Sequence, residues 1–178
     1  MDLKELGAYL RRPGTRDRVR VETRPWYDSA ADDPHFLRWR THGTVEADDT
    51  WRGWLDSIRA NIASGTTLRR VRVVADGPLN DYLHFELGVQ FPLNAEAGEQ
   101  IRVLTLPDTQ DLATLNDYFV IDGERVAVSH YDDGGKFQHA IAVENPALLI
   151  AQARELWEAA TPFADWWAAN RRYHQRIA

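Results

Sequence analysis

Alternation of apolar and polar residues predicts the strands of this chain. In the segment VRVE, Val19 and Val21 alternate with charged residues, so the valines are expected to point into a core. The arginines around them are expected to line the solvent face of that strand; they are Arg18, Arg20 and Arg24. The dipeptide Asp122-Gly123 is typical of a tight hairpin between two strands. The predicted strands lie at residues 18–24, 70–75, 101–106, 117–121, 125–131 and 136–143.

Apolar residues spaced three and four apart predict the helices. Asp33-Pro34 is a good helix start, because a capping side chain precedes a proline at the first position. Pro92 lacks a backbone donor and clashes with the preceding turn, so we expect an irregular exit from the helix that spans about Leu79 to Val89. The predicted helices cover residues 2–11, 34–43, 49–64, 79–89 and 146–160, with a last segment that restarts at Thr161-Pro162.

These elements predict an α/β domain of the α+β kind. The strands at 70–75 and 101–106 flank a helix and form one β-α-β crossover, and the strands from 117 to 143 form an antiparallel meander. Helices are expected on the faces of the resulting mixed sheet. Residues 1–48 are expected to form a helix and strand appendage packed on a main domain of residues 49–178.

Composition narrows the class of protein. The 178 residues contain no cysteine, which excludes disulfides, thiolate metal sites and a thiolate nucleophile. The formal net charge of −6 argues against a general nucleic-acid binder. The start of the chain lacks the apolar core of a signal peptide, and no apolar run approaches membrane-spanning length, so a cytoplasmic location is expected. No cofactor and no membrane partner are predicted.

Glu86 is the charged residue that the helical pattern places in a core. On a wheel that starts at Leu79, Glu86 projects into the middle of the apolar side, and an ion pair with an arginine of an adjoining strand is favoured over catalysis. A catalytic acid would need a second carboxylate or a base nearby, and no spacing identifies one. The candidate partners are Arg70, Arg72 and Arg102. The residues expected to point away from this side are Asn80, Asp81 and His84.

The remaining candidate residues carry weaker signals. His130 and His139 lie on facing strands, and whether they share a face depends on the length of the hairpin loop. No His-x-x-x-His, His-x-His or His-Glu-x-x-His spacing occurs, so no metal site is predicted. Trp166 and Trp167 are adjacent and cannot both point inward, which indicates a contact surface at one of them.

Three blocks of sequence resemble an uncharacterised actinobacterial family of domains of unknown function. They are the DYLHFEL helix at 81–87, the NAEAGEQIR turn and strand at 94–102, and the DYFVIDGERVAVSHYDDGGKF meander at 117–137. Members of that family are often encoded beside small helix-turn-helix regulators of the XRE type, which implies a regulatory protein partner. The order of elements is also similar to one half of a phospholipase D-type domain. That superfamily's His-x-Lys pair is absent here, because no histidine is followed two residues later by lysine.

Two functional hypotheses follow. The leading one is a non-catalytic cytoplasmic regulatory or interaction protein that acts with a helix-turn-helix transcriptional regulator and does not itself bind nucleic acid. The alternative is a degenerate or unconventional hydrolase of the phosphodiesterase type. A pocket where the candidate residues converge would favour the hydrolase; these residues are His84, Glu86, His130 and Asp132.

Overall fold

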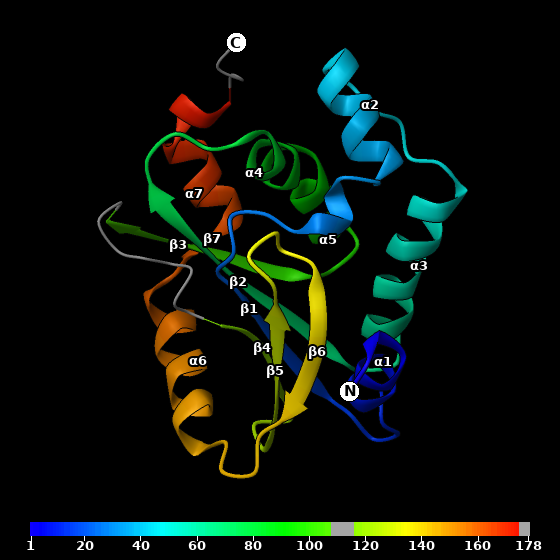
Figure 1. Cartoon of the computed structure of the whole chain (residues 1–178), viewed down its shortest axis with the longest axis vertical. Coiled ribbons are helices and arrows are strands. Elements are labelled where there is room, and N and C mark those ends of the chain that lie inside the picture. The colour runs from blue at the N-terminus through cyan, green and yellow to red at the C-terminus, as the bar shows by residue number, and fades with distance from the viewer. Residues whose placement is uncertain (108–115, 175–178) are drawn as a thin grey trace.

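The computed structural model describes residues 1–107 and 116–174. Its strands form a seven-stranded sheet with the order β6-β5-β4-β1-β2-β3-β7, which runs through the middle of the molecule in Figure 1. The strands are β1 (Asp17–Glu22), β2 (Thr67–Asp76), β3 (Gln100–Pro107), β4 (Asp117–Ile121), β5 (Arg125–Tyr131), β6 (Phe137–Ala142) and the two-residue β7 (Thr161–Pro162).

Helices cover both faces of this sheet. Figure 1 shows α3 and α6 on opposite sides of it. The α-helices are α1 (Leu3–Leu10), α2 (Pro34–His42), α3 (Asp49–Ala63), α4 (Asp81–Phe85), α5 (Phe91–Glu96), α6 (Ala147–Ala159) and α7 (Phe163–Ala169). The shorter helical segments are the 3-10 turns η1 (Asp28–Ala30) and η4 (Arg171–Tyr173) and the π-helical turn η2 (Glu86–Gln90). None of the helices in the described ranges is both long enough and apolar enough to cross a bilayer.

The sheet mixes parallel and antiparallel pairs, so the predicted α+β fold with a mixed sheet is confirmed. β2 pairs in parallel with β3, as the predicted crossover requires, and β4, β5 and β6 form the antiparallel meander. β1 also pairs in parallel with β2. The described chain therefore contains a second β-α-β crossover, which runs from β1 through α2 and α3 to β2. The sequence had predicted a single crossover, between β2 and β3.

β1 lies in the interior of the sheet. It pairs on one side with β2 and on the other with β4, which follows it by about a hundred residues in the chain. The segment 1–48, expected to be an appendage, thus supplies an interior strand to the sheet that residues 49–174 complete. The boundary expected at residue 48 falls between two strands that pair with each other.

The two faces of the sheet carry different residues. Val19, Val21, Val71 and Val73 point to the face that α6 covers and pack against its apolar residues. We call the opposite face, over which α1, α3, α4, α5 and α7 lie, the cavity face. The strand pairing places Arg20 beside Arg70 and Glu22 beside Arg72 on this face. The prediction that the arginines of β1 line a solvent face is therefore wrong for Arg20, because helices cover that side as well.

The helix that carries Glu86 continues further than the sequence predicted. α4, the π turn η2 and α5 form one continuous helical segment from residue 81 to residue 96, and Pro92 lies inside it. The amide of Phe91 donates to the carbonyl of Glu86, five residues back, which is the wide turn of a π helix. Pro92 follows this widened turn directly, so the helix accommodates the residue that was expected to end it.

The hairpin between β4 and β5 turns at the predicted dipeptide. Asp122 has φ of 55° and Gly123 has φ of 66°, as a type I′ turn requires of both central residues. The Asp122 carboxylate accepts hydrogen bonds from the backbone amides of Arg16 at 2.7 Å and Asp17 at 3.0 Å. The turn therefore holds the beginning of β1 as well as joining its own two strands.

Candidate functional site

The cavity face contains a cavity of about 800 Å³, within the size range of small-molecule sites. It lies between the sheet, helix α3, the continuous helical segment from α4 to α5, and the turn that joins β5 to β6. Charged side chains of the sheet and of η2 line its inner end, which we call the floor: Arg20, Glu22, Arg70 and Glu86. Glu22, Arg70 and Glu86 are all at least nine-tenths buried, so the floor holds an unusual concentration of buried charge.

Ion pairs link the floor residues of β1 and β2. Nη2 of Arg20 lies 2.6 Å from Oε1 of Glu22, and Nη1 of Arg70 donates to the other oxygen of Glu22 at 2.7 Å. Arg70 also donates through Nε and Nη2 to the two carboxylate oxygens of Glu99, at 2.9 and 3.3 Å. Arg20 and Arg70 stand beside each other on adjacent strands and would repel. Glu22 contacts both arginines, and its negative charge offsets that repulsion.

Arg72 and Glu86 form a second, fully buried pair. Nε of Arg72 donates to Oε2 of Glu86 at 2.7 Å, and the hydroxyl of Tyr82 donates to Oε1 at 3.1 Å. Nη2 of Arg72 donates to the backbone carbonyl of Arg24. Arg72 is one of the three arginines that the sequence proposed as partners of Glu86. Of the other two, Arg70 pairs with Glu22 and Glu99, and Arg102 donates to the carbonyls of Trp157 and Ala160.

The pKa values of the two floor carboxylates, Glu22 and Glu86, are shifted in opposite directions. Burial would raise the pKa of Glu22, but Arg20, Arg70 and Arg72 outweigh burial and lower the pKa to about 2. For Glu86, burial dominates over the attraction of Arg72, and the negative charge of Glu22 adds to it, so its pKa is raised. Such perturbed groups inside a cavity are typical of functional sites.

Six aromatic side chains contribute to the walls of the cavity. Trp54 donates from its indole nitrogen to Oδ1 of Asn94 at 3.2 Å, and Asn94 is itself only 5% exposed. Tyr82 packs edge-on against the ring of Tyr27, whose hydroxyl donates to Asp117. The aromatic residues that line the cavity are Tyr27, Trp51, Trp54, Tyr82, Tyr131 and Phe137.

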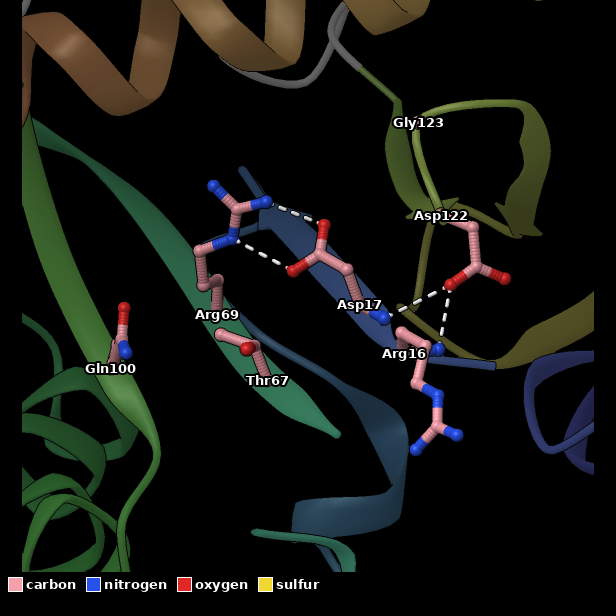
Figure 2. A pocket seen from close by; sticks show the side chains of 7 residues that line it. All are labelled: Arg16, Asp17, Thr67, Arg69, Gln100, Asp122 and Gly123. Atoms are coloured by element: carbon pink, nitrogen blue, oxygen red, sulfur yellow. Dashed lines mark hydrogen bonds and ion pairs between the residues drawn. The ribbon is translucent and has the colours of Figure 1, made fainter. Parts of the chain in front are cut away.

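A second cavity, of about 570 Å³, lies where the parallel strands β1, β2 and β3 begin. Figure 2 shows Arg69 bound to the carboxylate of Asp17 through two contacts, and the backbone of Arg16 and Asp17 bound to Asp122. These contacts tie the strand starts to the β4–β5 turn. Ligands of parallel sheets bind beyond the opposite, carboxyl ends of the strands. We therefore take the cavity with the buried ionic floor as the candidate site.

Comparison with models of protein families assigns the chain to a family. A family model described as a domain of unknown function, DUF6879, matches residues 4–168. The chain belongs to this family. The match begins in α1 and ends in α7, so the DUF6879 domain includes β1 and the whole seven-stranded sheet. A search of curated proteins finds no match to the chain.

The DUF6879 domain does not gather the four residues proposed for a hydrolase. Glu86 lines the large cavity, whereas His130 and Asp132 line a separate pocket of about 290 Å³. The carboxylate of Asp132 accepts hydrogen bonds from the amide of Lys136 and from Gln138, as expected of a turn. His84 lines neither of these pockets and is 7% exposed. The prediction that His84 points away from the core is wrong, because its helix is buried on more than one side.

The other residues singled out in the sequence are placed as follows. His130 and His139 do share a face of the sheet, and their rings stack with centroids 4.8 Å apart. Trp166 is 5% exposed and donates to Thr105 at 2.9 Å, so it belongs to the core rather than to a contact surface. Trp167 is partly buried and stacks on His174, which leaves it as the tryptophan of this pair that reaches the surface.

Sequence reasoning pointed to Glu86 and Arg70 but missed the two floor residues of β1. Arg20 and Glu22 stand two apart on β1, which places them on one side of a strand, and this spacing was the available signal. Asn94 and Glu99 carried no signal of their own. The place of Asn94 in the cavity depends on the continuation of the helix beyond Pro92, which lets α5 reach the cavity.

Proposed function

We propose that this protein is a non-catalytic cytoplasmic regulatory protein whose large cavity binds a small molecule. The observation that carries the proposal is the cavity of about 800 Å³, with aromatic walls and a buried ionic floor. Burial of an ion pair costs desolvation energy that can exceed the attraction between its charges, so these pairs need not stabilise the fold. A role in ligand binding would explain why the cavity contains them.

The occupied carboxylates favour binding over catalysis. Both oxygens of Glu22 already contact arginines, and the oxygens of Glu86 accept from Arg72 and Tyr82. A general base needs an oxygen within reach of the proton that it removes. Carboxylates that are bonded on both oxygens fix the arginines that they contact instead of removing a proton.

Fragment binding tests the proposal. A library of aromatic fragments, followed by ligand-observed NMR, should yield binders to the wild-type protein. Ser29→Trp, at an exposed residue that lines the cavity, should remove most of these signals by filling space. Ser57→Trp, on an exposed position of α3 that does not line the cavity, is the matched control. Equal binding to both variants would contradict a site in this cavity.

The regulatory part of the proposal rests on resemblance. The actinobacterial relatives that the sequence resembles are often encoded beside helix-turn-helix regulators, so we propose such a regulator as the partner, with the partly buried Trp167 at the contact. Co-expression with the regulator encoded beside this protein's own gene, followed by size-exclusion chromatography, should give a stable complex. Separate elution of the two purified proteins at micromolar concentration would remove the regulator from the proposal.

One observation favours the alternative of a phosphodiesterase-type hydrolase. Glu22 and Glu86 line the same cavity with pKa values shifted apart, which is an arrangement that enzymes use for acid and base pairs. Wild-type protein and a His130→Ala, Glu86→Gln double variant should both fail to hydrolyse a chromogenic phosphodiester. Turnover by the wild type that the variant loses would replace the binding proposal with the hydrolase. The similarity to one half of a phospholipase D-type domain would then gain a functional meaning.

A further inference from the structure

Most of the hydrogen-bonding groups on the floor of the cavity are already bonded to other groups of the protein. On the acceptor side, each oxygen of Glu22 and Glu86 is already engaged by an arginine or a tyrosine. On the donor side, Arg70 uses all three of its nitrogens on Glu22 and Glu99. The groups left to meet a ligand are therefore found on other residues.

Arg20 is the first of these residues. A guanidinium carries five N–H donors, and within the described ranges the single ion pair of Arg20 is the one to Glu22. Its guanidinium also lies over the ring of Phe119, with 5.4 Å between its central carbon and the ring centroid. Its side chain is 30% exposed and lines the cavity. Arg20 therefore offers a cationic group with unused donors at the floor.

Asn94 is the second. The indole N–H of Trp54 can only donate, so the atom of Asn94 that it meets must be the amide oxygen. The NH2 group of Asn94 is then left, and in the described part of the chain it has no hydrogen-bond partner within the protein. A side chain that is 5% exposed and lines a cavity has reason to donate to something inside that cavity.

We propose that the ligand of this cavity is a planar aromatic acid, with its carboxylate on Arg20 and a further acceptor on the NH2 group of Asn94. The inference rests on the proposed function, because it names the class of molecule that the same cavity binds. A carboxylate supplies acceptors only, which is what a floor with spare donors requires. Flat apolar rings suit walls that are built from tryptophan, tyrosine and phenylalanine side chains.

A matched pair of probes tests the acid group. 2-Naphthoate and 2-naphthamide have the same ring and nearly the same shape, and they differ in the carboxylate. Titrations followed by ligand-observed NMR should show about tenfold tighter binding of 2-naphthoate to the wild-type protein. Arg20→Met should remove this preference while 2-naphthamide binding remains. Arg18→Met, on the same strand but outside the cavity lining, should keep the preference.

Asn94→Asp provides a second variant of almost unchanged shape. It keeps an oxygen for the indole of Trp54 and adds a negative charge to the cavity in place of the NH2 donor, so repulsion should weaken 2-naphthoate far more than the neutral 2-naphthamide. This variant tests the inference even if Arg20→Met does not fold. Circular dichroism and thermal unfolding of every variant separate lost binding from lost structure.

The outcomes distinguish this inference from the proposed function. If 2-naphthamide binds as tightly as 2-naphthoate, or if Arg20→Met and Asn94→Asp leave the preference unchanged, the acid class is wrong while the cavity remains a binding site. If neither probe binds the wild type and the fragment library also yields nothing, the binding function itself is wrong.

Discussion

Arg72 and Glu86 are joined inside the protein by a hydrogen-bonded ion pair of 2.7 Å, with 0% and 2% of their side chains exposed. One partner lies on a central strand and the other at the start of the π turn. The pair therefore fixes the helical segment against the sheet at the edge of the cavity. Since neither charge reaches bulk water, each depends on the other for its solvation.

Removal of one partner should destabilise the fold strongly. We expect Glu86→Ala to lower the free energy of unfolding by about 3 kcal/mol, because Arg72 is left buried and unpaired. Urea titration at neutral pH measures the loss. Glu96→Ala, at an exposed position at the end of α5, should change stability by less than about 0.5 kcal/mol. The double variant Arg72→Met, Glu86→Met should lose less stability than the sum of the losses of Arg72→Met and Glu86→Met alone. A loss equal to that sum would contradict the pairing.

Glu22 should make stability depend on pH below neutrality. Its pKa falls from an ordinary value of 4.5 to about 2 on folding, so its contribution is complete above pH 4.5 and is lost as the pH falls towards 2. The stability difference between wild type and Glu22→Gln should therefore shrink by an amount on the order of 3 kcal/mol between pH 5 and pH 2. Urea unfolding at several pH values provides the comparison. A difference that is constant over this interval would be inconsistent with the lowered pKa.

Glu86 should act in the opposite sense. Because its pKa is raised in the folded protein, the folded form binds a proton before the unfolded form does, and stability from this group increases as the pH falls through its folded pKa. The carboxyl carbon signals of Glu22 and Glu86, followed by NMR in selectively labelled protein, should titrate on opposite sides of the ordinary value. Coincident titrations would show that the floor does not separate the two groups.

Asp122 should be sensitive to both its backbone conformation and its carboxylate. Asp122→Ala should lower the free energy of unfolding by about 2 kcal/mol, since alanine is strained at positive φ and leaves the amides of Arg16 and Asp17 without their acceptor. Asp122→Gly avoids the strain of alanine but also lacks the acceptor, whereas Asp122→Asn keeps an acceptor oxygen, so both should lose less than Asp122→Ala. Thermal unfolding of the three variants gives their order. Equal losses would mean that neither strain nor the two amides matter.

Duplex DNA should bind weakly to the protein in the absence of a partner. The formal net charge of −6 repels the phosphate backbone, and the large arginine cluster of β1 and β2 is turned towards Glu22, Glu86 and Glu99. Fluorescence anisotropy with a random duplex at 150 mM salt should give no saturation at micromolar protein. Salt-dependent binding at submicromolar protein would contradict this expectation.

The sequence predicted the elements of the fold well where the pattern was local. Period-two alternation located the central strands, and Asp122-Gly123 located a hairpin, because both signals depend on neighbouring residues alone. Pairing between distant strands leaves no such signal. The position of β1 between β2 and β4 was therefore missed, and with it the second crossover.

The candidate site was predicted only in part for the same reason. The helical wheel placed Glu86 in a core, where Arg72 meets it. The wheel assumed one buried side, whereas α4 packs Leu83 into one apolar cluster and Phe85 into another, and His84 is buried between them in the sequence. The ion pairs of Arg70 with Glu22 and Glu99 join positions that are 48 and 29 residues apart, so no short motif contains them.

The interior position of β1 has a consequence for how the chain folds. Arg18 on β1 pairs with Ile121 on β4, so the centre of the sheet closes across about a hundred intervening residues. Contacts of such long range must overcome a large loss of chain entropy before they contribute, and they slow folding. During synthesis, β1 emerges early and stays without its β4 neighbour until most of the chain has followed. The floor residues of β1 and β2 are therefore synthesised well before the meander that completes the sheet beside them.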